Sequence, residues 1–178
     1  MGASPMRRRR GRRLNGRHST SWGVDLYRDR SNADRYRETV RSYLGFGKPM
    51  VVTEFGCCTY AGAADAGPLG FTVVDYDGRA GGWRLTGARV ERSEVEQALY
   101  LRELLATFDE AGVHGAFWHT FGGWLFPHMP DAAVDPDVGS FGLVKIMEAP
   151  DGHDGPVILE PKDAFRALGD AYGQRIPG

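Results

Sequence analysis

The chain is organised around the segment Lys48-Pro49-Met50-Val51-Val52-Thr53-Glu54-Phe55-Gly56. Its proline cannot donate to a β-ladder and suits the first residue of a strand. The apolar, β-branched run from Met50 to Thr53 predicts a strand that is buried on both faces, as in a parallel sheet. Glu54 then stands at the carboxyl end of this strand, where barrel and doubly wound enzymes place catalytic groups. The same glutamate could instead cap a loop or pair with an arginine, so both interpretations stand at this point.

A strand and a helix precede this segment. Residues 23–27 alternate in polarity and predict a short strand, and Ser31 and Asn32 offer N-caps to a helix that continues to about Leu44. Gly45 and Gly47 end that helix. Its apolar residues recur on one face: Tyr36, Val40, Tyr43 and Leu44. The order strand, helix, strand with short links predicts one parallel βαβ unit.

The second half of the chain continues the alternation. The capping box at residues 93–96 predicts a helix to about Ala111, and residues 115–121 and 141–146 predict two further strands. Glu160-Pro161-Lys162 opens a closing helix. The residues expected to face the core are Val95, Ala98, Leu101, Leu105 and Phe108 in the first helix, and Phe165, Leu168 and Tyr172 in the last.

The long connection from Cys57 to Val90 is rich in Gly, Ala and Asp. A loop of more than about 15 residues inside a compact domain is usually functional or partly structured. Residues 71–76 and 83–85 predict a small hairpin around Asp77-Gly78. Because this hairpin follows the Glu54 strand directly, we expect it on the same face as Glu54, although an excursion without a role would give the same pattern.

Charge divides the chain into two parts. Residues 1–22 contain seven arginines and no acidic residue, so the remainder carries a net charge of −8 against −1 for the whole chain. This composition predicts that the head, residues 1–22, is disordered and that the body, residues 23–178, forms one domain. The head could be a basic arm that binds nucleic acid or an anionic surface, or the product of a misplaced start codon or a shifted frame, which we favour. An export signal is not expected, because no apolar core follows the arginines.

Several other features have ordinary interpretations. Cys57 and Cys58 are adjacent and cannot form a disulfide framework, so we expect a reducing, cytoplasmic location. We expect both to be small packing residues. The histidines lack the spacing of metal ligands, so no metal and no cofactor is expected. Acidic residues in a proline-containing loop do not match a calcium-binding pattern and are expected to be solvated: Asp131, Asp135 and Asp137. No apolar run approaches the ~20 residues that span a bilayer.

Three predicted strand ends carry polar or aromatic side chains in order. They are Asp25 and Tyr27, then Glu54, then Trp118 and His119. This layout is typical of the active face of a βα barrel. A carboxylate beside a tyrosine hydroxyl and an indole suits a sugar, because the indole stacks on the apolar face of a pyranose while the carboxylate faces the anomeric carbon. We therefore predict Glu54 as the catalytic residue and the other four as substrate-binding residues.

These strand ends resemble strands six to eight of the (β/α)8-barrel glycoside hydrolase superfamily with two catalytic glutamates. More closely, residues 23–173 resemble a bacterial group labelled abortive (phage) infection proteins. The shared segments are Thr53-Glu54-Phe55-Gly56-Cys57-Cys58-Thr59-Tyr60, Gly139-Ser140-Phe141-Gly142-Leu143-Val144 and Glu160-Pro161-Lys162-Asp163-Ala164-Phe165. The fold class implied is α/β, the C-terminal part of a (β/α)8 barrel.

The resemblance also implies roles for individual residues. Glu54 matches the strand-seven nucleophile, Tyr27 the hydroxyl that hydrogen-bonds to it, and Trp118 the strand-eight sugar platform. The acid/base glutamate of the superfamily lies at the end of strand four, which this chain does not match, and a retaining pair needs two carboxyls about 5–5.5 Å apart. Asp25, Asp75 and Asp77 are the substitutes within the chain.

The expected function is therefore glycosidase-like, with retaining hydrolysis if the missing part is supplied. One alternative is a carbohydrate-binding or phage-defence interaction protein without catalysis, and another is nucleic-acid binding through the head, which the acidic body disfavours. A sheet of three or four parallel strands cannot close, so we expect an exposed strand edge. That edge predicts self-association or assembly with a second polypeptide.

Overall fold

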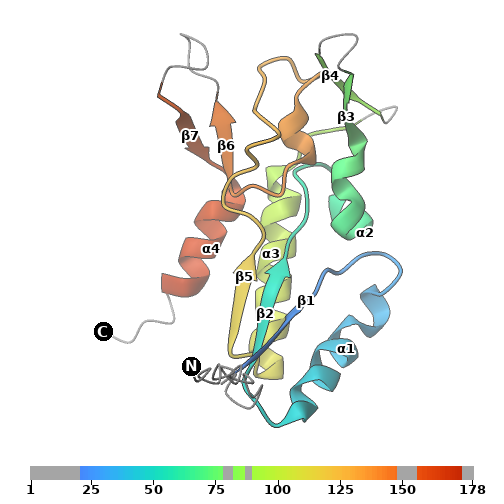
Figure 1. The fold of residues 1–178 in the computed structure, drawn as a ribbon, viewed down its shortest axis with the longest axis vertical. Coiled ribbons are helices and arrows are strands. Elements are labelled where there is room, and N and C mark those ends of the chain that lie inside the picture. The colour runs from blue at the N-terminus through green and yellow to red at the C-terminus, as the bar shows by residue number, and fades with distance from the viewer. Residues whose placement is uncertain (1–20, 78–81, 87–89, 148–155, 174–178) are drawn as a thin grey trace, which may run out of the picture.

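The computed structural model describes residues 21–77, 82–86, 90–147 and 156–173. The fold is mixed α/β (Figure 1), with a parallel sheet of order β1-β2-β5 at its centre. Its strands are β1 (Trp22–Asp25), β2 (Met50–Phe55) and β5 (Gly115–Trp118). Within the described residues these strands form an open sheet and no closed barrel. The α/β class and the parallel βαβ unit predicted from the sequence are confirmed.

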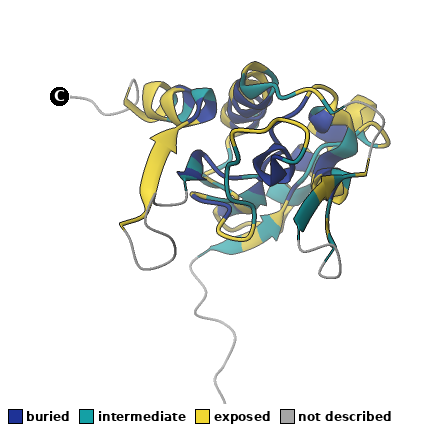
Figure 2. Ribbon diagram, turned by 90° about the horizontal axis from the view of Figure 1, so that it is seen from above, coloured by how far each residue is buried: buried dark blue, intermediate teal, exposed yellow. Residues whose placement is uncertain are grey.

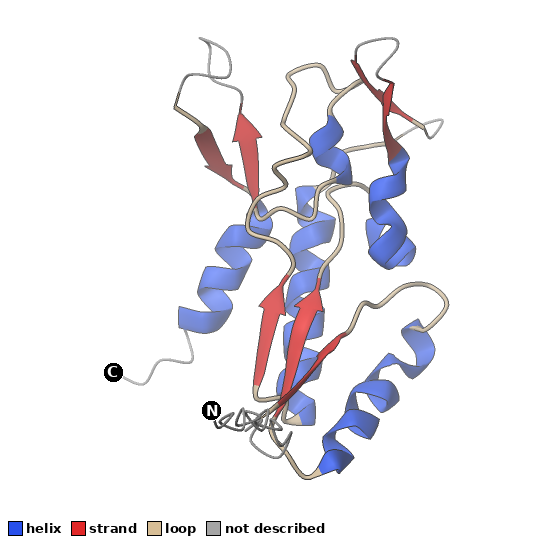
Figure 3. Cartoon of the chain, in the orientation of Figure 1, coloured by secondary structure: helices blue, strands red, loops and turns tan. Residues whose placement is uncertain are grey.

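The helices and two hairpins complete the fold. The helices are α1 (Tyr36–Tyr43), α2 (Ala63–Ala66), α3 (Glu94–Ala111) and α4 (Asp163–Gly173). One antiparallel hairpin pairs β3 (Val74–Asp77) with β4 (Gly82–Leu85), and the other pairs β6 (Val144–Met147) with β7 (Ile158–Pro161). Both hairpins lie beyond the carboxyl ends of β2 and β5 (Figure 3). Short 3₁₀ helices span Ala33–Arg35, Leu44–Phe46, Gly67–Val73 and Pro136–Gly139.

The first hairpin confirms the predicted pairing of the long connection, although its turn lies outside the described residues. Several boundaries differ from prediction. Strand β5 ends at Trp118 rather than at residue 121, β6 begins at Val144 rather than at residue 141, and residues 71–73 belong to a 3₁₀ helix rather than to the hairpin. Trp22, assigned to the head, is the first residue of β1, while residues 1–20 lie outside the described part. Asn32 makes no cap bond to the first helix, because its side chain instead donates to the Tyr27 carbonyl and accepts from the Asp29 N–H. Glu160 and Pro161 belong to strand β7 rather than to the closing helix.

Helix α3 begins as the capping box predicts, because the Ser93 hydroxyl accepts from the Glu96 N–H at 3.2 Å. The reciprocal bond differs: the Glu96 carboxylate accepts from the Gly62 and Ala64 N–H groups and so ties α2 to α3. Val95 was predicted to be buried but is 62% exposed. The side chains that do bury are Gln97, Ala98, Tyr100, Leu101, Leu104, Leu105, Thr107 and Phe108.

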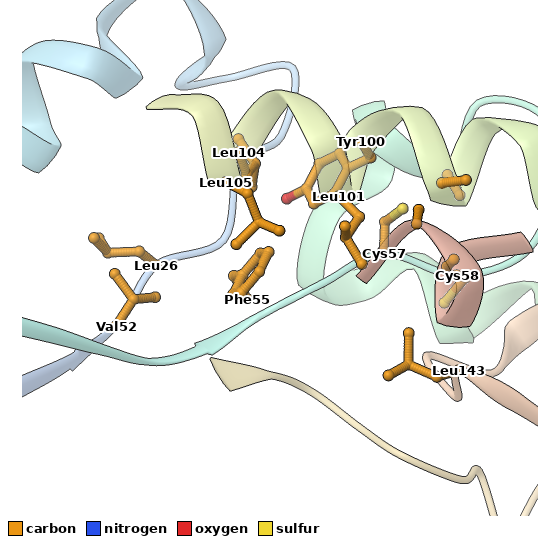
Figure 4. Close-up of a cluster of buried hydrophobic side chains, with 14 of the residues drawn as sticks. Leu26, Val52, Phe55, Cys57, Cys58, Tyr100, Leu101, Leu104, Leu105 and Leu143 are labelled. Carbon is orange, nitrogen blue, oxygen red and sulfur yellow. The ribbon is translucent and has the colours of Figure 1, made fainter. Parts of the chain in front are cut away.

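The core lies between α3 and the sheet (Figure 4). Figure 2 shows buried residues in the interior of the molecule and exposed residues on the outer sides of the helices. Phe55 is fully buried, and its ring meets Phe108 and Trp118 edge-on at centroid distances of 5.1 and 5.3 Å. Cys57 and Cys58 are also fully buried, which confirms them as packing residues. Burial raises the pKa of both thiols, because a thiolate would lose its hydration there.

A buried ion cluster replaces the solvated loop expected around Asp135 and Asp137. Asp137 is fully buried, 2.9 Å from the Lys162 ammonium and 2.5 Å from the Arg92 guanidinium. Asp135 is 2% exposed and lies 2.9 Å from both Arg92 and His128. The sequence interpretation was wrong for these two residues, because cations from distant segments, β7–α4 and the start of α3, compensate their charges. Asp131 is exposed as expected.

Helix α4 turns a different face inward from the one predicted. Phe165 and Tyr172 are each 40% exposed and Leu168 is half-buried, while Ala164 and Ala167 are the buried residues. The close approach of α4 to α3 explains the preference for alanine at their contact. None of the described helices is long and apolar enough to cross a membrane.

Candidate functional site

Glu54 ends up at the carboxyl edge of the parallel sheet, as the sequence predicts. Asp25 of β1 is its register partner, and the ladder on each side of β2 shifts register close to Glu54. Such irregularities re-aim side chains at the end of a strand. The Glu54 side chain is 43% exposed, so its carboxylate can meet a ligand from solvent.

Tyr27 holds this carboxylate directly. Its hydroxyl donates to Glu54 Oε2 at 3.1 Å. Burial raises the pKa of the Tyr27 phenol, and the neighbouring Glu54 and Asp25 charges raise it further. The phenol therefore stays protonated at neutral pH and keeps donating to Glu54, which fixes the orientation of the carboxylate.

His119 approaches Glu54 from the third strand. Its Nδ1 lies 3.9 Å from Glu54 Oε1, and its ring is 46% exposed. The backbone is anchored by the His119 N–H, which donates to the Phe55 carbonyl at 2.9 Å, and the following peptide bond to Thr120 is cis. The three predicted strand ends thus bring Tyr27, Glu54 and His119 together.

Asp25 and Trp118, the other two predicted binding residues, are engaged in different contacts. The Thr53 hydroxyl donates to Asp25 Oδ1 at 2.7 Å, on the open face of the sheet. The Trp118 ring packs against Phe55 and Tyr100, and its indole N–H donates to the Phe141 carbonyl at 2.8 Å. A sugar platform at Trp118 stays a prediction, and only the part of its ring left exposed could serve it.

Phe141 is a site residue that the sequence did not indicate. Its ring lies edge-on to Tyr27 at 6.1 Å and tilted to His119 at 6.0 Å between centroids. Sequence reasoning placed Phe141 at the start of a strand, with no signal for the site. It reaches the site because its carbonyl accepts from the Trp118 indole and the Thr120 N–H, contacts that only the folded chain provides.

Gly56 gives a direct test of how tightly this site is packed. A Cβ at this position would lie 2.6 Å from the His119 carbonyl oxygen and 3.3 Å from the Phe141 ring. We expect Gly56→Ala to lower the free energy of unfolding by about 1–3 kcal/mol, because the backbone at His119 must move. Urea unfolding measures this cost. Gly45→Ala is the control, since nothing lies within 4 Å of a Cβ there, and an equal cost in both variants would contradict the prediction.

The arrangement offers one oriented, half-exposed carboxylate beside a neutral phenol, an imidazole and an aromatic ring. Such a carboxylate can accept hydrogen bonds from hydroxyl groups or attack an electrophilic carbon. Within the described residues, no group of three or more His, Cys, Asp or Glu could hold a metal ion. No protein-family model matches the sequence, and no curated protein matches it.

Proposed function

We propose that this site binds a carbohydrate and is of the glycoside hydrolase type, with Glu54 facing the anomeric carbon. The observation that carries the proposal is the hydrogen bond from Tyr27 to Glu54 at the carboxyl ends of adjacent parallel strands. A retaining glycosidase needs an ionised carboxylate held in one orientation, and the neutral phenol supplies that orientation. His119 and Phe141 would line the same ligand position.

The finer fold assignment belongs to this proposal. We assign β1, β2 and β5 to strands six, seven and eight of a (β/α)8 barrel, supported by their parallel order and by Glu54 at the carboxyl edge. Three segments that resemble abortive-infection proteins also meet in space. Thr59 donates to the Ser140 carbonyl at 3.1 Å and accepts from the Lys162 ammonium at 2.9 Å.

Hydrolysis in this proposal needs an acid to protonate the leaving group. In the superfamily that glutamate comes from strand four, so it would be supplied from outside the matched residues. Asp25 is the carboxylate on the strand next to Glu54, but it accepts a hydrogen bond from Thr53. Glu54 alone can still attack a substrate whose leaving group needs no proton.

The lack of an acid for the leaving group favours a second candidate function, which is carbohydrate binding without turnover in a phage-defence interaction protein. The engagement of Asp25 with Thr53 supports it, because the neighbouring carboxylate is already committed. The Arg-rich segment behind the nucleic-acid alternative lies outside the described residues, so that alternative gains no structural support.

The experiment uses substrates that bypass the missing acid. We expect 2,4-dinitrophenyl glycosides, tested as a panel of common pyranosides, to release phenolate with wild-type protein. Intact mass spectrometry with the matching 2-fluoro glycosides should show a covalent adduct on Glu54. Glu54→Gln should lose the adduct and lower the rate more than about 100-fold, because amide nitrogen and oxygen are poor nucleophiles.

Glu38→Gln is the control, because it makes the same chemical change on exposed helix α1. Sugar binding by calorimetry without phenolate release or adduct would support the binding candidate. Neither turnover, adduct nor binding for any member of the panel would contradict the proposal, and so would equal rates for wild type and Glu54→Gln.

A further inference from the structure

The parallel sheet has two outer edges. Within the described residues no strand pairs with the outer side of β1 or of β5. Edge strands present unpaired backbone groups that template the addition of another strand. Both edges can therefore take part in an interface, and their surroundings differ.

The β5 edge lies beside a groove in which a further strand could bind. An apolar groove of about 430 Å³ separates β5 from α4, and Figure 1 shows α4 beside α3 on the β5 side of the sheet. The Tyr172 hydroxyl ties α4 to β5 by donating to the Ala116 carbonyl at 2.6 Å. No residue of the lining carries a charge: Gly115, Ala116, Phe117, Trp118, Phe121, Leu143, Leu168 and Tyr172.

The exposure of this groove is large for apolar side chains. Phe117 is 63% exposed and Phe121 50%. Phe165, outside the lining and 40% exposed, extends this apolar surface, because its ring centroid lies 6.5 Å from that of Phe121. Contiguous apolar surface of this kind usually marks an interaction site. Here α4 extends the helical layer past β5, so a strand added beside β5 would be covered on one face, like β2.

The identity of the strand follows from sterics and from the position of the groove. Pairing of two β5 edges, with the helices of both copies on the same face, would bring two copies of α4 to the same place beside β5. Pairing of two β1 edges would leave the apolar groove uncovered, because the groove lies beside β5. Addition of β1 to β5, parallel like the rest of the sheet, avoids the clash and covers the groove.

We propose that the β5 edge and the α4 groove bind strand β1 of a second copy of this chain, in parallel. The interface is heterologous, so each added copy leaves a free β1 edge and a free β5 edge. Association should therefore continue beyond a dimer as concentration rises. This inference depends on the sheet and the groove and is independent of the proposed function.

Sedimentation velocity of the full chain between 5 and 200 µM tests the interface. We expect the wild-type sedimentation coefficient to rise with concentration past the value of a dimer. Phe117→Lys should weaken association at least about tenfold, because it places a charge in the uncharged groove. Leu125→Lys is the matched control, since Leu125 is 78% exposed and lies outside the groove lining.

Cross-linking identifies the strand that occupies the groove. Ser21 and His114 directly precede β1 and β5, so a short bismaleimide should join Ser21→Cys in one copy to His114→Cys in another. Cys57 and Cys58 are fully buried and do not compete. Three results would overturn the proposal: a 19.6 kDa monomer at 200 µM, unchanged association of Phe117→Lys, or cross-links only between two His114→Cys chains. The last would indicate β5–β5 pairing.

Discussion

Replacing Asp137 by alanine should lower the free energy of unfolding by about 3–5 kcal/mol. The substitution leaves the Lys162 ammonium fully buried, with the Thr59 hydroxyl as its remaining hydrogen-bond partner. Removing one member of a buried ion pair costs far more than removing a surface pair, because the remaining charge has lost both its hydration and its counter-ion.

The companion variants separate the charge effect from lost packing. We expect Lys162→Met to cost less than Asp137→Ala, because Asp137 keeps the Arg92 guanidinium at 2.5 Å. The double variant should cost less than the sum of the two single variants, since it leaves no unpaired lysine. Urea unfolding monitored by circular dichroism provides all three free energies.

Asp131→Ala is the control from the same loop. Asp131 is exposed, and its carboxylate accepts only a local bond from the Ala133 N–H at 3.0 Å among its described contacts. Its substitution should cost no more than about 0.5 kcal/mol. A cost below about 1 kcal/mol for Asp137→Ala would show that the ion cluster does not hold the hairpin β6–β7 and the helices together.

Phe55→Ala should also lower the free energy of unfolding by about 3–5 kcal/mol, in this case through the loss of apolar packing rather than of an ion pair. Phe55 is fully buried and contacts Phe108 of α3 and Trp118 of β5 edge-on. Truncation leaves a cavity between the sheet and its main helix. Because Phe55 directly follows Glu54, this cavity also removes support from beneath the candidate site.

Urea unfolding again provides the measurement, and Phe55→Leu should cost less, since leucine fills more of the space. Leu125→Ala, at a 78% exposed position, should stay within about 0.5 kcal/mol of wild type. A Phe55→Ala protein with wild-type stability would mean that the sheet and α3 do not form one cooperative unit.

Local patterns in the sequence were enough for the central architecture. The apolar run at residues 50–53, the serine cap at residue 93 and the glycines that end the helices predict a βαβ unit and helix α3. The prediction that this run is buried on both faces was wrong, because Met50 and Val52 are buried beneath α3 whereas Thr53 is exposed on the other face of the sheet. The parallel order of the strands also predicts that their carboxyl ends meet at one edge of the sheet, which brings Tyr27, Glu54 and His119 together. These features depend on periodicity and capping, which are properties of short segments.

Tertiary structure decided the features that join distant segments. Asp135 and Asp137 look like solvated loop residues in the sequence, yet cations from other elements allow them to be buried. Phe141 enters the site because its carbonyl accepts hydrogen bonds from the Trp118 indole and the Thr120 N–H, just beyond another strand end. The exposure of Phe165 and Tyr172 follows from which face of α4 meets α3. Sequence periodicity gives the polarity of a segment, whereas burial and partners depend on which other segments pack against it.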